Sequence, residues 1–164
     1  MRFIPNHQRV PHRPIVLIAA LLATGATGCA GAAGLPQLVH ARQAHFKSLG
    51  RSLKSLRDQI RRSQPDWSIV AADTDRIQHL AGALPTWFPA GSGKGHGVKT
   101  RARAAIWAHP RAFAQAARTF LSRAQGLTQA AGGRDRRALA LRARALGQAC
   151  GSCHRRFRAR HSWW

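Results

Sequence analysis

The chain has 164 residues, enough for one compact domain and a short additional segment. It carries 27 lysines and arginines against 5 acidic residues, all aspartate, which gives a formal net charge of +22. Its 31 alanines, its many arginines and its lack of tyrosine favour helices and argue against a β-sandwich. No apolar stretch in the sequence reaches the ~20 residues of a membrane-spanning helix, and three cysteines cannot staple a scaffold of several disulfides.

The N-terminal part of the sequence has the three sections of a secretory signal. A start with three arginines and no acid leads into a short apolar core at residues 14–23, and small residues follow as far as Ala30-Gly31-Ala32. This pattern predicts a cleaved signal peptide over residues 1–32, followed by one domain over residues 33–164. Two alternatives stay open: a buried N-terminal helix, and a lipoprotein anchor on Cys29.

Four later segments repeat apolar residues three or four positions apart, which places them on one face of a helix. Helices are therefore predicted over residues 36–62, about 66–83, about 103–131 and about 135–160. Residues 84–101 are rich in glycine and proline and are predicted to be irregular. Four amphipathic helices with mostly short connections predict an all-α four-helix bundle.

Local signals mark where these helices begin and end. Pro65 is expected to end the first helix, Asp66 to cap the second, and Gly132-Gly133 to end the third. Many inward positions are alanine, so the helices alone would bury little apolar area. The core is therefore expected to contain an additional bulky group.

The residues Cys150-Gly151-Ser152-Cys153-His154 have the spacing of a covalent haem-attachment motif. Two thiols add to the two vinyl groups of one haem, and the imidazole of the next residue binds the iron. On a helix, positions i, i+3 and i+4 share one face, so Cys150, Cys153 and His154 are expected to point together into the core. The motif predicts one haem c attached through two thioethers, with His154 as the metal ligand.

Two other interpretations of this motif fit its setting less well. A redox dithiol is expected in a strand–helix setting, which this helix end lacks. A zinc site would need a further nitrogen or sulfur ligand at regular spacing, and none is convincing. No acid–base pair or nucleophile constellation accompanies the motif, so the chain is not predicted to be an enzyme.

With these features the chain resembles the cytochrome c′ family, the class II c-type cytochromes, from about Arg42 to Arg160. The shared residues are Arg42-Gln43, residues 84–89, Gly91-Ser92-Gly93, Ile106-Trp107, Phe113, the Cys-x-x-Cys-His motif and Phe157-Arg158. The resemblance implies a left-handed antiparallel four-helix bundle with covalently bound haem, usually a homodimer, in the bacterial periplasm.

The resemblance implies that function depends on which residue stands at the second axial position of the iron. Members with methionine on the first helix are six-coordinate electron carriers, and members with an apolar residue there are five-coordinate and bind NO or CO. The only methionine here is Met1, and the matching position is Phe46. The resemblance thus implies a periplasmic c-type cytochrome with five-coordinate iron, His154 as axial ligand, one-electron transfer and binding of NO or CO.

His45 leaves a second reading open, because it adjoins Phe46 and lies near the same apolar stripe. As a ligand it would make a six-coordinate bis-His electron carrier without gas binding. It could instead occupy the pocket rim, make a hydrogen bond in the pocket or lie at a dimer interface. A further class is a gas-sensing module whose output is dissociation of the dimer.

The resemblance also assigns roles to charged and polar residues. It places Arg42 and Gln43 near the haem propionates, and Arg158 beside the axial histidine. The basic excess predicts an acidic redox partner, and the export signal together with haem attachment argues against a nucleic-acid partner.

Overall fold

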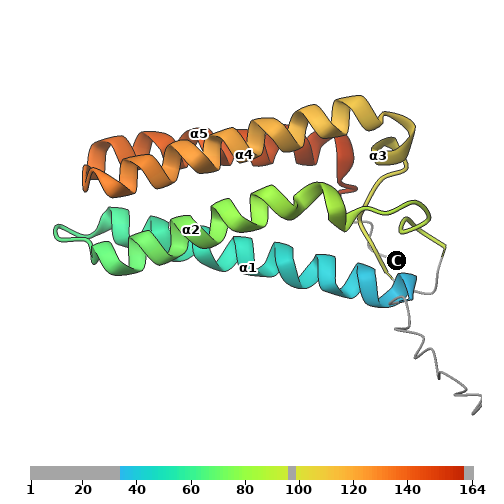
Figure 1. Ribbon diagram of the computed structural model, residues 1–164, viewed down its shortest axis with the longest axis horizontal. Helices are drawn as coiled ribbons and strands as arrows, with labels where there is room; N and C mark the ends of the chain where they lie inside the picture. The colour runs from blue at the N-terminus through green and yellow to red at the C-terminus, as the bar shows by residue number, and fades with distance from the viewer. Residues whose placement is uncertain (1–33, 96–98, 161–164) are drawn as a thin grey trace, which may run out of the picture. The chain divides into compact units, whose positions relative to one another are not determined.

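The computed structural model describes residues 34–95 and 99–160, and the predicted signal peptide lies outside them. The described residues form a bundle of four long helices (Figure 1). These are α1 (Leu35–Arg61), α2 (Trp67–Ala83), α4 (Pro110–Gly132) and α5 (Arg136–Phe157). Two short elements, the 3-10 helix η1 (Leu84–Trp87) and α3 (Ala105–Ala108), lie between α2 and α4. The predicted all-α four-helix bundle is confirmed.

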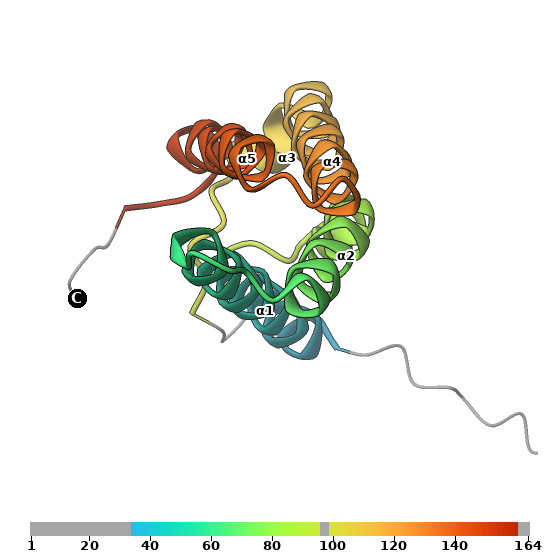
Figure 2. The ribbon, with the colours of Figure 1, turned by 90° about the vertical axis from the view of Figure 1, so that its left-hand side faces the viewer.

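Helices that follow one another along the chain are the main packing partners. α1 packs on α2, α2 on α4 and α4 on α5, whereas α1 and α5 contact each other much less. Figure 2 shows the order α1, α2, α4, α5 around the bundle. α1 and α5 diverge toward the end at which α1 begins and α5 ends (Figure 1). The cysteines of α5 lie toward this end.

The core combines large apolar residues with many alanines, as expected from the sequence. Its fully buried side chains include Leu56, Val70, Ile77, Leu127 and Leu146. Five core positions are alanine, namely Ala81, Ala117, Ala124, Ala131 and Ala143. Small side chains allow close approach of the helices but bury little area each.

Aspartates cap the two helices that follow tight turns. The Asp66 carboxylate accepts hydrogen bonds from the backbone N–H groups of Ser68 and Ile69 at the start of α2. Asp135 accepts in the same way from Arg137 and Ala138 at the start of α5. These bonds satisfy backbone donors that have no partner within the helix.

The predicted third helix, over residues 103–131, is wrong in one respect. It is divided into α3 and α4 by His109, whose φ of −128° and ψ of 61° are not helical. The reason is Pro110, because a proline disfavours the helical conformation of the residue before it and is well placed as the first residue of a helix. The predicted irregular segment likewise contains η1, which begins at Leu84-Pro85.

The last helix ends at Phe157, earlier than the predicted residue 160. The residues after it form an isolated antiparallel bridge, in which Arg158 pairs with Ala102. The Arg103 N–H donates to the Phe157 carbonyl at 3.0 Å, and the Ala159 N–H donates to the Arg101 carbonyl at 2.8 Å. None of the helices in the described part of the chain is long and apolar enough to cross a membrane.

Candidate haem site

Cys150 and Cys153 are free thiols on one side of α5, both half-buried and packed against the core. Leu146 and Phe157, which precede and follow them on the same face, are buried and fix the rotation of the helix. His154 lies at the edge of this face with an exposed side chain. The expectation that all three point into the core is thus met by the cysteines, whereas the histidine lies at its margin.

The environment favours the uncharged forms of these three side chains. Burial raises the pKa of the Cys150 thiol, and the charge of Arg57 on α1 only partly opposes this effect. Burial also raises the pKa of Cys153, as does the neighbouring Cys150. Although the His154 side chain is exposed overall, partial desolvation of the imidazole lowers its pKa, and the charge of Arg101 lowers it further. A neutral imidazole is the form that binds a metal.

The residues present fit a covalently bound haem. Two free thiols three positions apart are followed directly by an imidazole, as two thioethers and one axial iron ligand require. They lie where α5 faces Arg57 of α1, and of the four pairs of long helices that neighbour each other around the bundle, α1 and α5 have the least mutual contact. Within residues 34–95 and 99–160, no group of three or more His, Cys, Asp or Glu side chains could hold a metal ion, so the zinc alternative finds no ligand set there.

Arg42 is almost fully buried, with 3% of its surface exposed. Its two terminal nitrogens donate four hydrogen bonds, to the carbonyls of Trp87 and Ser92 and to the hydroxyls of Ser92 and Thr100. The guanidinium also lies over the Phe88 ring, 4.6 Å from its centroid, and burial lowers the pKa of Arg42. Because these bonds use all four terminal N–H groups, Arg42 anchors the segment between α2 and α3, and its contact with a haem propionate stays a prediction.

Other side chains fix the same segment. Gln43 donates from Nε2 to the Lys99 carbonyl at 2.7 Å. Trp107 donates from Nε1 to the carbonyls of Phe88 and Pro89. A Cβ on Gly93 would lie 3.1 Å from the Trp107 ring, so glycine permits the close approach of the backbone. Sequence reasoning missed Ser92 and Thr100 as partners of Arg42, since no local pattern connects residues so far apart.

Phe46 belongs to an aromatic cluster with Trp87 and Phe88, two residues of the segment between α2 and α3 that Arg42 anchors. Its ring meets Trp87 edge-on at 5.3 Å and Phe88 at 6.2 Å between centroids, and 36% of its surface is exposed. Phe88 contacts Phe113 at 4.9 Å, and Phe113 contacts Phe157 at 5.3 Å. The cluster therefore extends from α1 to the end of α5, three residues beyond His154.

Arg158, the remaining predicted site residue, follows directly after α5. Its backbone N–H donates to the His154 carbonyl at 3.0 Å, and it pairs with Ala102 in the isolated bridge. Its side chain is exposed. The backbone thus brings Arg158 beside the turn that carries His154, while a role of its guanidinium near the haem stays a prediction.

A four-helix bundle whose last helix carries the Cys-x-x-Cys-His set is the architecture of a bundle-type c-type cytochrome. The sequence model of the family described as cytochrome C′ matches residues 37–158. A cytochrome c-554 from Cereibacter sphaeroides is 32% identical over 126 residues, which cover 76% of this chain and 94% of the relative. The chain belongs to the cytochrome c′ family, and its cofactor is covalently attached haem c.

Solved structures agree with this fold. The cytochrome c′ of Thermochromatium tepidum superimposes with a TM-score of 0.73 at 22% identity, over 77% of this chain and 98% of that protein. A variant of cytochrome c prime from Alcaligenes xylosoxidans, solved as its nitric oxide complex, superimposes with a TM-score of 0.70 at 22% identity, over 78% and 98% of the two chains. Membership of this family makes the chain a haem protein of the electron-transfer and gas-binding kind.

Proposed function

We propose that the haem iron of this chain is five-coordinate, with His154 as its only protein ligand, and that the protein transfers single electrons and binds NO or CO. The observation that carries this proposal is Phe46, which stands on α1 in an aromatic cluster with Trp87 and Phe88. A phenylalanine cannot ligate iron, and the only methionine of the chain is Met1. When bound, the haem supplies a one-electron iron couple and a coordination position for a diatomic gas.

The residues of the chain would then act as follows. His154, whose neutral form is favoured because desolvation lowers its pKa, would offer a ring nitrogen to the iron. Phe46, Trp87 and Phe88 form an apolar wall that disfavours water and anions but not small neutral molecules. Arg42 contributes to this wall indirectly, because its hydrogen bonds to the carbonyls of Trp87 and Ser92 fix the position of the segment that contains Trp87 and Phe88. The nitric oxide complex of the Alcaligenes xylosoxidans protein supports this assignment.

His45 supports the second candidate function, a six-coordinate bis-His electron carrier. Its ring stacks on Trp87 with centroids 4.7 Å apart, next to Phe46 in the sequence. The five-coordinate assignment needs no ligand other than His154 and leaves this stack intact.

The proposal extends to the setting of the protein. The secretory pattern in residues 1–32 supports a periplasmic location. The large positive charge supports an acidic redox partner. We also propose a homodimer, which sedimentation of the holoprotein with and without CO would test: a single monomeric species under both conditions would contradict it.

The test is the absorption spectrum of the holoprotein in its ferric and ferrous states, before and after addition of CO. We expect broad high-spin spectra and a clear shift of the ferrous spectrum with CO. A sharp low-spin spectrum that does not respond to CO would contradict the proposal and favour His45 as a ligand. The His45→Ala variant is the matched control, because it removes the only competing ligand named here.

A further inference from the structure

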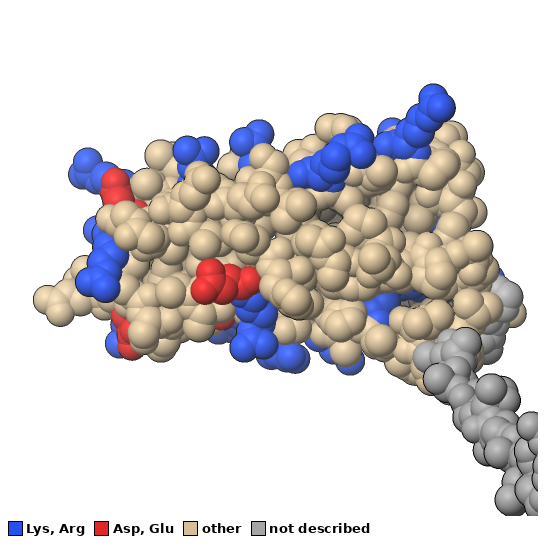
Figure 3. All heavy atoms as spheres, viewed as in Figure 1, with Lys and Arg blue, Asp and Glu red and all other residues tan. Residues whose placement is uncertain are grey.

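The positive charge of the bundle is concentrated on its last two helices. α4 and α5 contain nine arginines and no acidic residue, whereas α1 and α2 contain three of the five aspartates. Both ion pairs recorded among the described residues lie on α1, where Asp58 pairs with Lys54 and Arg61. Figure 3 shows basic side chains projecting along the edge formed by α4 and α5, and acidic ones over α2. Within residues 34–95 and 99–160, the arginines of α4 and α5 therefore take part in neither ion pair.

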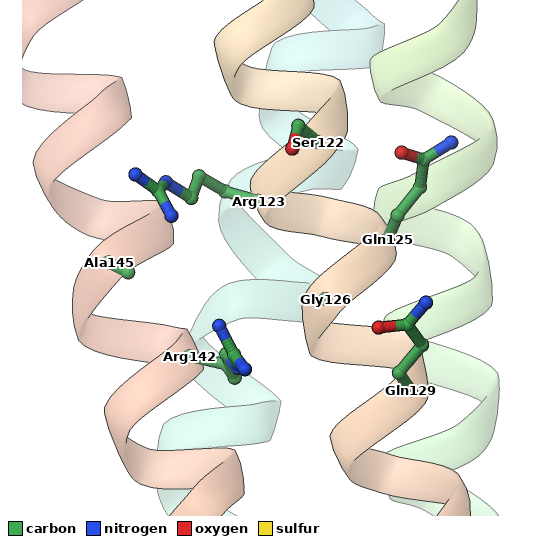
Figure 4. Close-up of a pocket in the computed structure, with 7 residues that line it drawn as sticks. All are labelled: Ser122, Arg123, Gln125, Gly126, Gln129, Arg142 and Ala145. Atoms are coloured by element: carbon green, nitrogen blue, oxygen red, sulfur yellow. The ribbon is translucent and has the colours of Figure 1, made fainter.

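A groove runs along the outer face between these two helices. One part, of about 240 Å³, is lined by Arg123, Gly126 and Arg142 among others, and Figure 4 shows Arg123 reaching from α4 toward α5 while Arg142 lies beside Gly126. A Cβ at Gly126 would lie 3.7 Å from Arg142 Cδ, an ordinary van der Waals distance, so the Arg142 side chain packs over Gly126. A second part, of about 400 Å³, shares Arg123 and continues to Arg156.

The second part of the groove leads to the haem attachment point, because Cys153 and Phe157 line it. A protein seated in the groove would lie against one of the two residues that hold the haem. Alanines, including Ala145 and Ala149, line this part of the groove together with Arg123 and Arg156. Encounters between redox proteins use small, weak interfaces, and complementary charge accelerates and orients them.

We propose that this groove, bordered by Arg123, Arg142 and Arg156, is the docking surface for an acidic redox protein. The inference rests on the electron-transfer part of the proposed function. The exchange moves one electron: the partner's reduced cofactor is oxidised by one electron, the ferric iron is reduced to ferrous, and no bond forms or breaks. The carboxylates of the partner pair with the arginines while its surface near the cofactor covers the Cys153 end of the groove.

The test uses the holoprotein and an acidic flavodoxin as the probe. The groove variant is the double substitution Arg123→Glu and Arg142→Glu, and the control is Arg51→Glu and Arg76→Glu on α1 and α2. All four arginines are exposed, and the two variants change the net charge equally. At low ionic strength we expect the groove variant to bind oxidised flavodoxin at least about tenfold more weakly by calorimetry, and the control to change about threefold or less.

Reduction kinetics separate a failure of the docking surface from a failure of the proposed function. Reduction by flavodoxin hydroquinone should slow in the groove variant and become similar in all proteins at high salt. Neutral lumiflavin semiquinone should reduce wild type and control at the same rate, and its failure to reduce wild type would overturn the electron-transfer function itself. Equal losses of flavodoxin binding in both variants, or binding to wild type that is insensitive to salt, would overturn the groove as the docking surface.

Discussion

The imidazole of His45 stacks on the indole of Trp87, with ring centroids 4.7 Å apart and ring planes inclined by 24°. The next residue on α1, Phe46, contacts the same indole edge-on, with ring centroids 5.3 Å apart. Trp87 itself is 8% exposed, and its carbonyl accepts a hydrogen bond from Arg42. Two adjacent residues of α1 are thus positioned by one buried tryptophan, and their different geometries lead to different expectations on substitution.

Replacing His45 with alanine should leave the haem spectrum unchanged. In the five-coordinate assignment the imidazole only packs against the indole of Trp87, so the substitution removes that packing and no iron ligand. The measurement is the ferric and ferrous absorption spectrum, together with the rate of CO binding. A change from low-spin wild type to high-spin variant would show that His45 is a ligand.

Replacing Phe46 with methionine should introduce a sixth ligand. A thioether can bind haem iron, and the resemblance to cytochromes c′ places residue 46 on the open side. We expect a low-spin ferrous spectrum and CO binding that is slower by about tenfold or more, since a tenfold change corresponds to only about 1.4 kcal/mol. Phe46→Leu is the control and should stay high-spin. A high-spin Phe46→Met protein with unchanged CO binding would place residue 46 away from the iron.

Replacing Arg42 with lysine should destabilise the holoprotein by about 2–3 kcal/mol, because lysine cannot reproduce the planar set of four hydrogen bonds in a buried site. Urea unfolding followed by circular dichroism measures this change. Arg51→Lys, at an exposed position of α1, should stay within about 0.5 kcal/mol of wild type. If Arg42→Lys were as stable as wild type and altered only the haem's redox potential, then Arg42 would serve mainly as a propionate ligand.

The N-cap at Asp135 should contribute measurable stability. Its carboxylate accepts two backbone N–H bonds at the start of α5, and Asp135→Ala should cost about 1 kcal/mol. Asp135→Asn should retain most of this, since the amide oxygen can also cap. An alanine variant as stable as wild type in thermal unfolding would mean that water replaces the cap without loss.

The equivalent cap at Asp66 should show a defined pH dependence. The hydrogen bond from the Ser68 hydroxyl, followed by the backbone bonds of Ile69 and Ser68, lowers the pKa of Asp66. A lowered pKa in the folded state means that the stabilisation is complete above the ordinary aspartate pKa of about 3.9 and is lost as the pH falls through the lower, folded value. The stability difference between wild type and Asp66→Asn should therefore be constant from neutral pH down to about pH 4 and shrink below it.

Much of the fold was predictable from local patterns. The apolar spacing of α1 and α2 and the capping role of Asp66 follow from interactions within a few residues. The break at His109 also had a local signal in Pro110, but the alanines on both sides of it continue a helical pattern. The early end of α5 had no such signal, because the pairing of Arg158 with Ala102 joins residues that are far apart in the chain.

The attachment chemistry and the helices follow from local patterns in the amino-acid sequence. Two cysteines and a histidine at positions i, i+3 and i+4 lie near one another on any helix, and a 3.6-residue apolar period yields amphipathic helices without knowledge of their partners. The hydrogen bonds from Arg42 to Ser92 and Thr100, and the groove on α4 and α5 that reaches Cys153, became visible only in the folded chain. These contacts depend on how separate helices pack, and packing brings together residues that no local spacing relates.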